Sequence, residues 1–197
     1  MTAAGESTLP CIDGVSTRSP VVHLDHRGAL FEIYNGDPDI WPDPVVYAYQ
    51  ASVFPGQIKG WARHEVKNDR YTLAVGELIV LLHDGRPASP TYGMTQRIVL
   101  SDRGVRQLVI PAGVWHLLIN AGAVETHVIN FPTERYHHDQ PDRILLPWDT
   151  DELPVDVKAH LPSCFDLRGL GGWRVCARRG ASAAGEGRAA AAFRGAV

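Results

Sequence analysis

Apolar residues in this chain come in short runs, separated by glycine, proline and polar residues every eight to fifteen positions. Apolar and polar side chains often alternate within a run, as in strands that bury one face. No long stretch shows the i, i+3, i+4, i+7 spacing of an amphipathic helix. This pattern indicates an all-β barrel or jelly roll rather than an α/β fold. The strands that we expect span residues 21–24, 29–34, 45–53, 58–62, 69–75, 77–82, 96–100, 107–110, 115–120 and 125–131.

The two ends of the chain lack this pattern. Residues 1–19 are small and polar, and we expect them to form an N-terminal arm. Residues 132–147 are predicted to be a polar, proline-containing loop, and residues 148–154 a turn or the start of a helix. Residues 171–197 are rich in Arg, Gly and Ala without an apolar face, which predicts a disordered tail. Residues 20–170 then form one domain, with a short helical or irregular segment at its C-terminal end.

Composition narrows the classes of function. The net charge is −3 and charged residues make up 21% of the chain. The chain therefore has no excess of basic residues of the kind that binds nucleic acid. No apolar run approaches the roughly 18 residues of a membrane helix, and the first twenty residues do not read as a secretion signal. The three cysteines have no metal-ligand spacing and are expected to be reduced thiols. We therefore expect a cytoplasmic protein without a nucleic-acid or membrane partner.

Candidate chemistry lies in two similar segments. The first reads Gly-x3-His64-x4-Asp69-x6-Gly76, and the second reads Pro-x-Gly-x2-His116-x3-Asn120. In both, polar side chains lie on strand-like runs that are closed by glycine or proline. A small β-barrel can point such side chains at one interior point.

These paired motifs resemble those of the cupin superfamily. Further short motifs resemble the dTDP-4-dehydrorhamnose 3,5-epimerase group, in the family's order over about residues 20–166. They are Asp25-x-Arg27-Gly28-x2-Phe31-Glu32, Gln50, Gly76-Glu77, Asp84-x-Arg86, Ser89-Pro90-Thr91-Tyr92-Gly93 and Ile110-Pro111-x-Gly113-x2-His116. The resemblance implies a cupin jelly-roll β-barrel. It also implies a homodimer in which N-terminal strands pack across the partner subunit.

The resemblance implies a catalytic pair. His64 matches the base that takes the proton next to a ketone, and Asp166 falls near the position of the acid that orients it. By ungapped reading, the tyrosine that returns the proton in true epimerases falls on Asn130, whose amide cannot donate a catalytic proton. The implied substrate-binding residues are Arg27, Phe31, Gln50, Lys59, Trp61, Arg63, His116 and Asn130.

Several of these residues have a second interpretation. Arg27 resembles a phosphate-binding arginine that reaches into the partner's pocket, but it equally fits a surface arginine in a hairpin turn. Arg86 and Asp84 fit a structural pair that holds their loop better than a substrate contact. Trp61 could stack on a sugar ring or fill the barrel.

A metal site is the alternative chemistry. Metal-binding cupins usually present His-x-His-x4-Glu and a later histidine, and here Ala62 replaces the first histidine. His64, Asp69 and His116 could still form a two-histidine, one-carboxylate site for a divalent transition metal such as iron. The epimerase resemblance implies no metal and no other cofactor.

Two functional classes follow. The first is a dTDP-4-keto-6-deoxysugar epimerase or isomerase in deoxysugar or natural-product biosynthesis, with a nucleotide sugar as its small-molecule substrate. The second is a repurposed cupin, either a metal-dependent oxygenase or cyclase acting on a non-nucleotide metabolite, or a binding protein without catalysis. The retained motifs favour the first class, and Asn130 favours the second.

Overall fold

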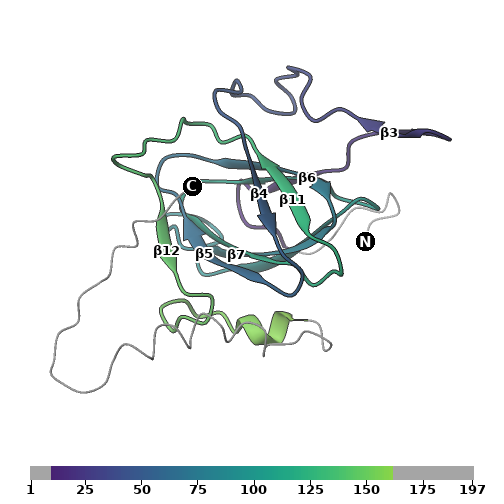
Figure 1. Ribbon diagram of the computed structural model, residues 1–197. Coiled ribbons are helices and arrows are strands. Elements are labelled where there is room, and N and C mark those ends of the chain that lie inside the picture. Colours follow the sequence, from purple (N-terminus) through teal and green to yellow (C-terminus); the bar gives the residue numbers. More distant parts are fainter. Residues whose placement is uncertain (1–9, 162–197) are drawn as a thin grey trace, which may run out of the picture.

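The computed structural model describes residues 10–161, and their regular structure is nearly all β. Two five-stranded antiparallel sheets face each other (Figure 1). The first contains β1 (Ser16–Arg18), β9 (Gln107–Ile110), β6 (Asp69–Val75), β11 (Thr126–Asn130) and β4 (Tyr49–Val53), in pairing order. The second contains β12 (Ile144–Leu146), β5 (Ile58–Arg63), β10 (Val114–Ile119), β7 (Glu77–Asp84) and β8 (Thr95–Ser101).

From β4 onward the chain changes sheet at nearly every connection, except for the β7–β8 hairpin. This connectivity is that of a jelly roll, so the predicted all-β jelly roll is confirmed. The predicted barrel needs one correction. In residues 10–161 no strand ladder joins the two sheets, which therefore form an open sandwich.

Alternation along the strands divides the apolar residues into two clusters. In β7, Val80 and Leu82 point between the sheets and join the larger cluster. Leu81 points to the other face of the second sheet, where it packs with Trp61 and Trp115. This outer cluster is covered by the irregular segment that follows β12 and by the 3-10 helix η1 (Val157–His160). The expected short helical or irregular C-terminal segment thus closes the second sheet from outside.

Three sequence-based ranges differ from the structure. The strand expected over residues 45–53 forms only from Tyr49. Before it, the carbonyl oxygens of Asp43 and Pro44 accept from the Arg70 side chain instead of from a neighbouring strand. The segment expected as a loop over residues 132–147 contains β12, which pairs with β5. Residues 148–154 form turns, and η1 starts only at Val157.

The N-terminal arm lies partly within the first sheet. Its strand β1 pairs with β9, and Ile12 and Val15 are buried in the larger core cluster. A separate hairpin follows, made of β2 (Val22–Asp25) and β3 (Gly28–Phe31). Figure 1 shows it projecting from the sandwich.

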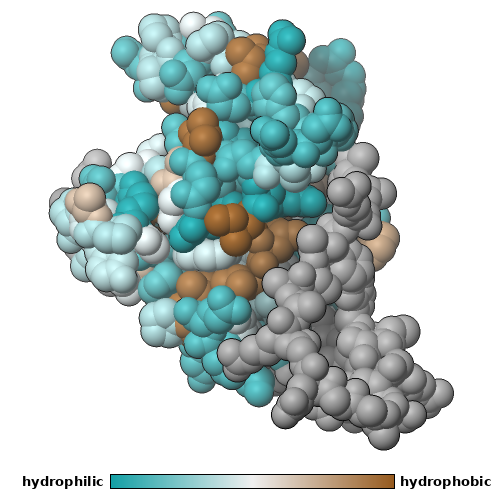
Figure 2. All heavy atoms as spheres, turned by 90° about the vertical axis from the view of Figure 1, so that its left-hand side faces the viewer, coloured by the Kyte–Doolittle hydropathy of each residue, from teal (hydrophilic) through white to brown (hydrophobic). Residues whose placement is uncertain are grey.

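The opposite side of the molecule carries β12. Figure 2 shows apolar side chains gathered near the centre of this face, among polar ones. Ile144 and Leu145 of β12, a short edge strand, are exposed large apolar residues. Among residues 10–161, none of the helical segments has the length and apolar character to cross a bilayer.

Candidate active site

Two histidines and one carboxylate from different strands meet inside the sandwich. Asp69 is the first residue of β6, His116 lies within β10, and His64 follows the end of β5. The backbone N–H of Gly113 donates to the carbonyl of His64 at 2.7 Å, which ties the two histidine-bearing segments together. All three side chains are buried. The structure therefore confirms that the two motifs converge at one interior point.

The Asp69 carboxylate is the centre of this cluster. Its Oδ2 lies 3.2 Å from Nε2 of His64, 3.5 Å from Nε2 of His116 and 3.3 Å from the hydroxyl of Tyr71. Its Oδ1 accepts a hydrogen bond from Nδ2 of Asn130 at 2.8 Å. Tyr71 and Asn130 thus donate to one buried carboxylate that two histidine nitrogens also face, which is how a buried charge is stabilised.

The charges follow from this arrangement. Burial alone would raise the pKa of Asp69, but the hydrogen bond from His64 and the histidine charges outweigh it and hold the pKa well below its usual range. Burial lowers the pKa of His116 to about 4, because the opposing Asp69 charge compensates only in part. Burial, together with the Asp69 charge, raises the pKa of Tyr71 well above its usual value. At neutral pH Asp69 is ionised, His116 neutral and Tyr71 protonated.

His64 is held from two sides. Its Nδ1 contacts the carbonyl oxygen of Asp142, and its Nε2 faces Asp69. The Asp142 carboxylate accepts from the backbone N–H groups of Glu65, Val66 and Lys67 at 2.7–3.0 Å, so the segment after His64 is fixed as well. Since a carbonyl oxygen can only accept, Nδ1 carries a hydrogen. Nε2 of the neutral ring then has a lone pair, and it donates to Asp69 only when the ring carries a second proton.

Asn130 links the cluster to a second tyrosine. Tyr49, Asn130 and Tyr71 lie directly opposite one another on the neighbouring strands β4, β11 and β6. Asn130 Nδ2 donates to the Tyr49 hydroxyl at 2.9 Å as well as to Asp69, and its Oδ1 accepts from the backbone N–H of Arg70 at 3.0 Å. The amide is therefore fully hydrogen-bonded and fixed.

The loop of residues 84–93, between the two motifs, is held by its own hydrogen bonds. Asp84 is fully buried and its carboxylate accepts from Arg86, Ser89 and Thr91 at 2.6–2.8 Å. The Arg86 side chain packs against Gly113, whose φ of +82° favours glycine; a Cβ there would lie 2.5 Å from Cγ of Arg86. The loop thus supports the turn before His116, in agreement with the structural interpretation of the Asp84–Arg86 pair.

Several residues proposed from the sequence lie elsewhere. Trp61 is buried in the outer cluster, and Arg63 lies over the Trp115 ring on the same outer face. The Lys59 ammonium donates to the Ser52 carbonyl, and Gln50 is exposed and hydrogen-bonded to His127. None of these four contacts the Asp69 cluster in the described part of the chain.

The remaining proposed residues divide into two groups. Arg27 and Phe31 lie in the β2–β3 hairpin, where Arg27 is paired with Asp25 and the Phe31 ring packs under the Arg106 guanidinium. Asp166 lies outside the described residues. In residues 10–161, the His64 ring contacts the Asp142 carbonyl oxygen and the Asp69 carboxylate.

Sequence reasoning missed Tyr49, Tyr71, Lys67 and Asp142. Tyr71 follows Asp69 by two residues on one strand, so strand alternation could have placed both on the same face. Lys67 is buried, its ammonium lies over the Tyr136 ring, and its charge contributes to the low pKa of His116. Tyr49 and Asp142 reach the site through strand pairing and a long loop, for which the sequence carries no local signal.

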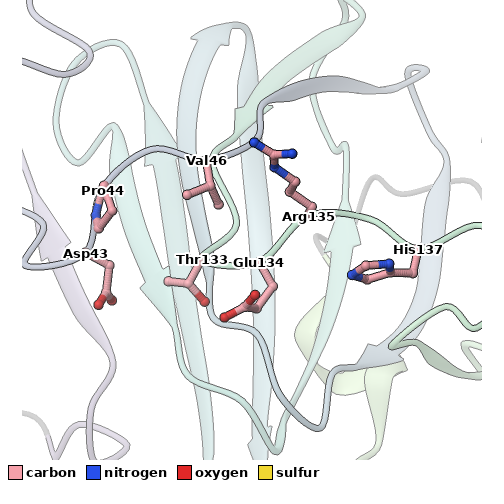
Figure 3. A pocket seen from close by; sticks show the side chains of 7 residues that line it. All are labelled: Asp43, Pro44, Val46, Thr133, Glu134, Arg135 and His137. Atoms are coloured by element: carbon pink, nitrogen blue, oxygen red, sulfur yellow. The ribbon is translucent and has the colours of Figure 1, made fainter.

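The structure also has an open pocket of about 480 Å³, whose lining includes no residue of the Asp69 cluster. It lies between the chain before β4 and the chain after β11, and Figure 3 shows the His137 ring turned back toward Glu134 and Thr133. Its lining residues are Asp43, Pro44, Val46, Thr133, Glu134, Arg135 and His137. The Thr133 hydroxyl accepts from the backbone N–H of Asn68, the residue before Asp69, so the cavity wall is attached to the site.

The cluster has the groups for proton transfer. A histidine nitrogen lies beside an ionised carboxylate in a buried environment, and tyrosine hydroxyls are close to the same carboxylate. The ligand atoms of His64, Asp69 and His116 also lie within 4.8 Å of one another, so these residues could hold a metal ion. Within residues 10–161, however, both Asp69 oxygens already accept hydrogen bonds, from Tyr71 and Asn130.

Comparisons with known proteins agree with this geometry. The family model described as dTDP-4-dehydrorhamnose 3,5-epimerase matches residues 10–166. The chain is 30% identical to the probable low-salt glycan biosynthesis epimerase Agl13 of Haloferax volcanii over 154 residues, which cover 78% of this chain and 99% of that protein. The sequence-based resemblance is thereby confirmed.

Two solved structures have the same fold. A dTDP sugar isomerase from Desulfovibrio desulfuricans G20 superposes with a TM-score of 0.70 at 24% identity, covering 80% of this chain and 96% of that one. A dTDP-6-deoxy-D-glucose-3,5-epimerase from Legionella pneumophila, solved with dTDP-4-keto-L-rhamnose, has a TM-score of 0.64 at 21% identity and covers 74% and 79%.

Proposed function

The chain belongs to the dTDP-4-dehydrorhamnose 3,5-epimerase family, and we propose that it removes and returns a proton next to the ketone of a dTDP-4-keto-6-deoxysugar. The family and its relatives indicate a sugar epimerase or isomerase function in glycan or deoxysugar biosynthesis. The proposed proton transfer is supported by the buried His64, whose Nδ1 contacts a carbonyl oxygen and whose Nε2 lies beside Asp69.

The chemistry follows from this placement. A ketone makes the adjacent C–H acidic, because the electron pair left by the proton is delocalised onto the carbonyl oxygen. Nε2 of neutral His64 takes the proton, and the imidazolium that forms lies beside the Asp69 carboxylate, which stabilises its charge. Nδ1 stays on the Asp142 carbonyl throughout and fixes the ring orientation.

The proposed reaction uses no cofactor. Enzymes of this family act without a metal, which fits the sequence-based expectation. The metal-dependent alternative on His64, Asp69 and His116 makes an opposite prediction, because it requires a near-stoichiometric transition metal. Elemental analysis of the purified protein separates the two.

A nucleotide-sugar ligand is testable through Arg27. We propose that this exposed hairpin arginine binds the diphosphate of the ligand. Arg27→Ala should raise the Kd for dTDP by about tenfold or more, and it should reduce the thermal stabilisation that dTDP gives the wild type. Arg103→Ala, which removes an exposed arginine from the turn after β8, is the matched control. An unchanged Kd in Arg27→Ala would rule out this contact.

The hairpin that carries Arg27 also supports the proposed homodimer. Leu24 and Leu30 are 79% and 63% exposed, although both belong to regular strands. Such side chains on a projecting hairpin fit burial against a second subunit. The double variant Leu24→Asp, Leu30→Asp should run as a monomer in size-exclusion chromatography with light scattering, whereas wild type and the loop control Val124→Asp should run as dimers. A monomeric wild type, or a dimeric double variant, would contradict this assembly.

A further inference from the structure

The proposed reaction lacks a proton donor at position 130. Inversion at a carbon requires that one group takes the proton from one face and that another group returns a proton to the opposite face. Asn130 occupies the position that the family resemblance assigns to the donor, and an amide cannot supply a proton near neutral pH. A donor therefore has to come from another element.

Tyr49 stands directly opposite Asn130 on the neighbouring strand. Its hydroxyl oxygen accepts a hydrogen bond from Asn130 Nδ2 at 2.9 Å, and the other hydrogen of that amide goes to Asp69 at 2.8 Å. The side-chain oxygen of Asn130 accepts a hydrogen bond from the backbone N–H of Arg70. The side-chain amide therefore cannot turn without breaking this bond. Asn130, which cannot transfer a proton to the substrate, therefore fixes the position of the Tyr49 phenol oxygen.

The hydrogen of the Tyr49 hydroxyl is free for a ligand. In residues 10–161 the hydroxyl accepts from Asn130 but has no acceptor for its own hydrogen. The ring is only partly buried, so a ligand can approach it. Tyr71 differs in both respects, because it is buried and its hydroxyl already donates to Asp69.

Charge keeps Tyr49 protonated. Burial, and then the nearby Asp69 carboxylate, raise the pKa of Tyr49 to about 12 against the weaker effect of Asn130. A phenol with this pKa keeps its proton across the neutral range. It becomes a phenolate only transiently, while a strongly basic enolate carbon takes the proton.

Tyr49 and His64 are both linked to Asp69, His64 by direct contact and Tyr49 through Asn130. The carbonyl of Asp142 contacts His64, and the next residue, Arg143, lies close enough to Tyr49 for its charge to act on the phenol. Tyr49 belongs to the edge strand of the first sheet, whereas His64 follows a strand of the second. A ligand bound between them has one group from each sheet.

We propose that Tyr49 donates the proton to the face of the carbon opposite His64, with Asn130 as its positioning residue. This inference rests on the proposed epimerase function. His64 takes the proton as the C–H bond breaks and the enolate forms. The enolate carbon then forms a bond to the Tyr49 hydrogen, and the ketone is restored. Solvent returns a proton to the phenolate and removes one from His64, so the step needs no other reactant.

The test separates exchange from inversion. Wild type, Tyr49→Phe and the control Tyr47→Phe, which removes a neighbouring phenol hydroxyl, are incubated with dTDP-4-keto-6-deoxyglucose in D2O. Tyr49→Phe should keep deuterium exchange within about threefold, because His64 can return a deuteron to the face it came from, and should lose inversion by about 100-fold or more. Tyr47→Phe should resemble wild type in both.

The outcomes are distinguishable. Inversion by Tyr49→Phe within about threefold of wild type would overturn the role of Tyr49 while leaving the function standing. A wild type that neither exchanges nor inverts would overturn the function and this inference together. If Tyr49→Phe does not fold, 3-fluorotyrosine at position 49 keeps the ring and hydroxyl but lowers the phenol pKa. The alkaline limb of the inversion rate should then move to lower pH, and an unmoved limb would refute the proposal.

Discussion

His64→Asn should lower deuterium exchange next to the ketone of dTDP-4-keto-6-deoxyglucose by about 1,000-fold or more, a loss within the range for removal of a positioned base. Asparagine can still donate from its amide to the Asp142 carbonyl, but it has no nitrogen that accepts a proton near neutral pH. The loss should appear in kcat, because His64 acts on the reacting C–H bond rather than on the nucleotide.

The controls for His64 test whether the effect is local. His160→Asn removes an imidazole from η1, outside the Asp69 cluster, and should leave exchange unchanged. The Kd of His64→Asn for dTDP should also stay close to the wild-type value. Exchange in His64→Asn within about tenfold of wild type would refute the role of His64 as the base.

Asp69→Asn should reduce the free energy of unfolding by about 3 kcal/mol near neutral pH, because it removes the charged acceptor of buried hydrogen bonds. The new amide would place donor hydrogens against Asn130 or Tyr71, which both donate to the carboxylate in the wild type. Denaturant unfolding of wild type, Asp69→Asn and the exposed control Asp102→Asn measures the difference. A loss no larger than that of Asp102→Asn would contradict the central place of Asp69.

The difference in unfolding free energy between wild type and Asp69→Asn should depend on pH. The pKa of Asp69 is held below its unfolded value of 3.8, so the unfolded chain binds this proton first as the pH falls. The stabilisation by Asp69 is therefore present above that pH and is lost in acid. The pKa of His116, about 4 against 6.5 when unfolded, acts in the same direction. Wild-type stability should thus fall as the pH drops below about 6.5, and the gap to Asp69→Asn should narrow in strong acid.

Much of the fold was predictable because strand alternation and turn residues are local signals. Residues 69–75 and 107–110 form strands with the predicted bounds, and the other strands of the two sheets from β5 to β11 differ by one or two residues at an end. The early start expected for β4 was wrong because Arg70, distant in sequence, binds the preceding carbonyl groups. β12 was missed because three residues next to a proline carry little pattern, and its pairing with β5 defines it.

The residues of the site were predictable only where a local motif marks them. Motif spacing predicted His64, Asp69 and His116, since each motif places its residue on or directly after a strand whose position the jelly roll fixes. It did not give Tyr49 or Asp142, because their contacts depend on which strand lies beside β11 and where a long loop returns. Trp61 was proposed as a ligand contact, yet strand alternation in β5 turns it to the outer cluster. Sequence alone could not tell that face from the inner one, because both are apolar.

The most direct measurement is deuterium incorporation into dTDP-4-keto-6-deoxyglucose by wild-type protein in D2O, on a sample whose metal content is determined in parallel. We expect deuterium at a carbon next to the ketone, at a rate that a chelator does not change, in protein without a stoichiometric metal. No incorporation, or incorporation that disappears with removal of a bound transition metal, would contradict proton transfer by His64 beside Asp69.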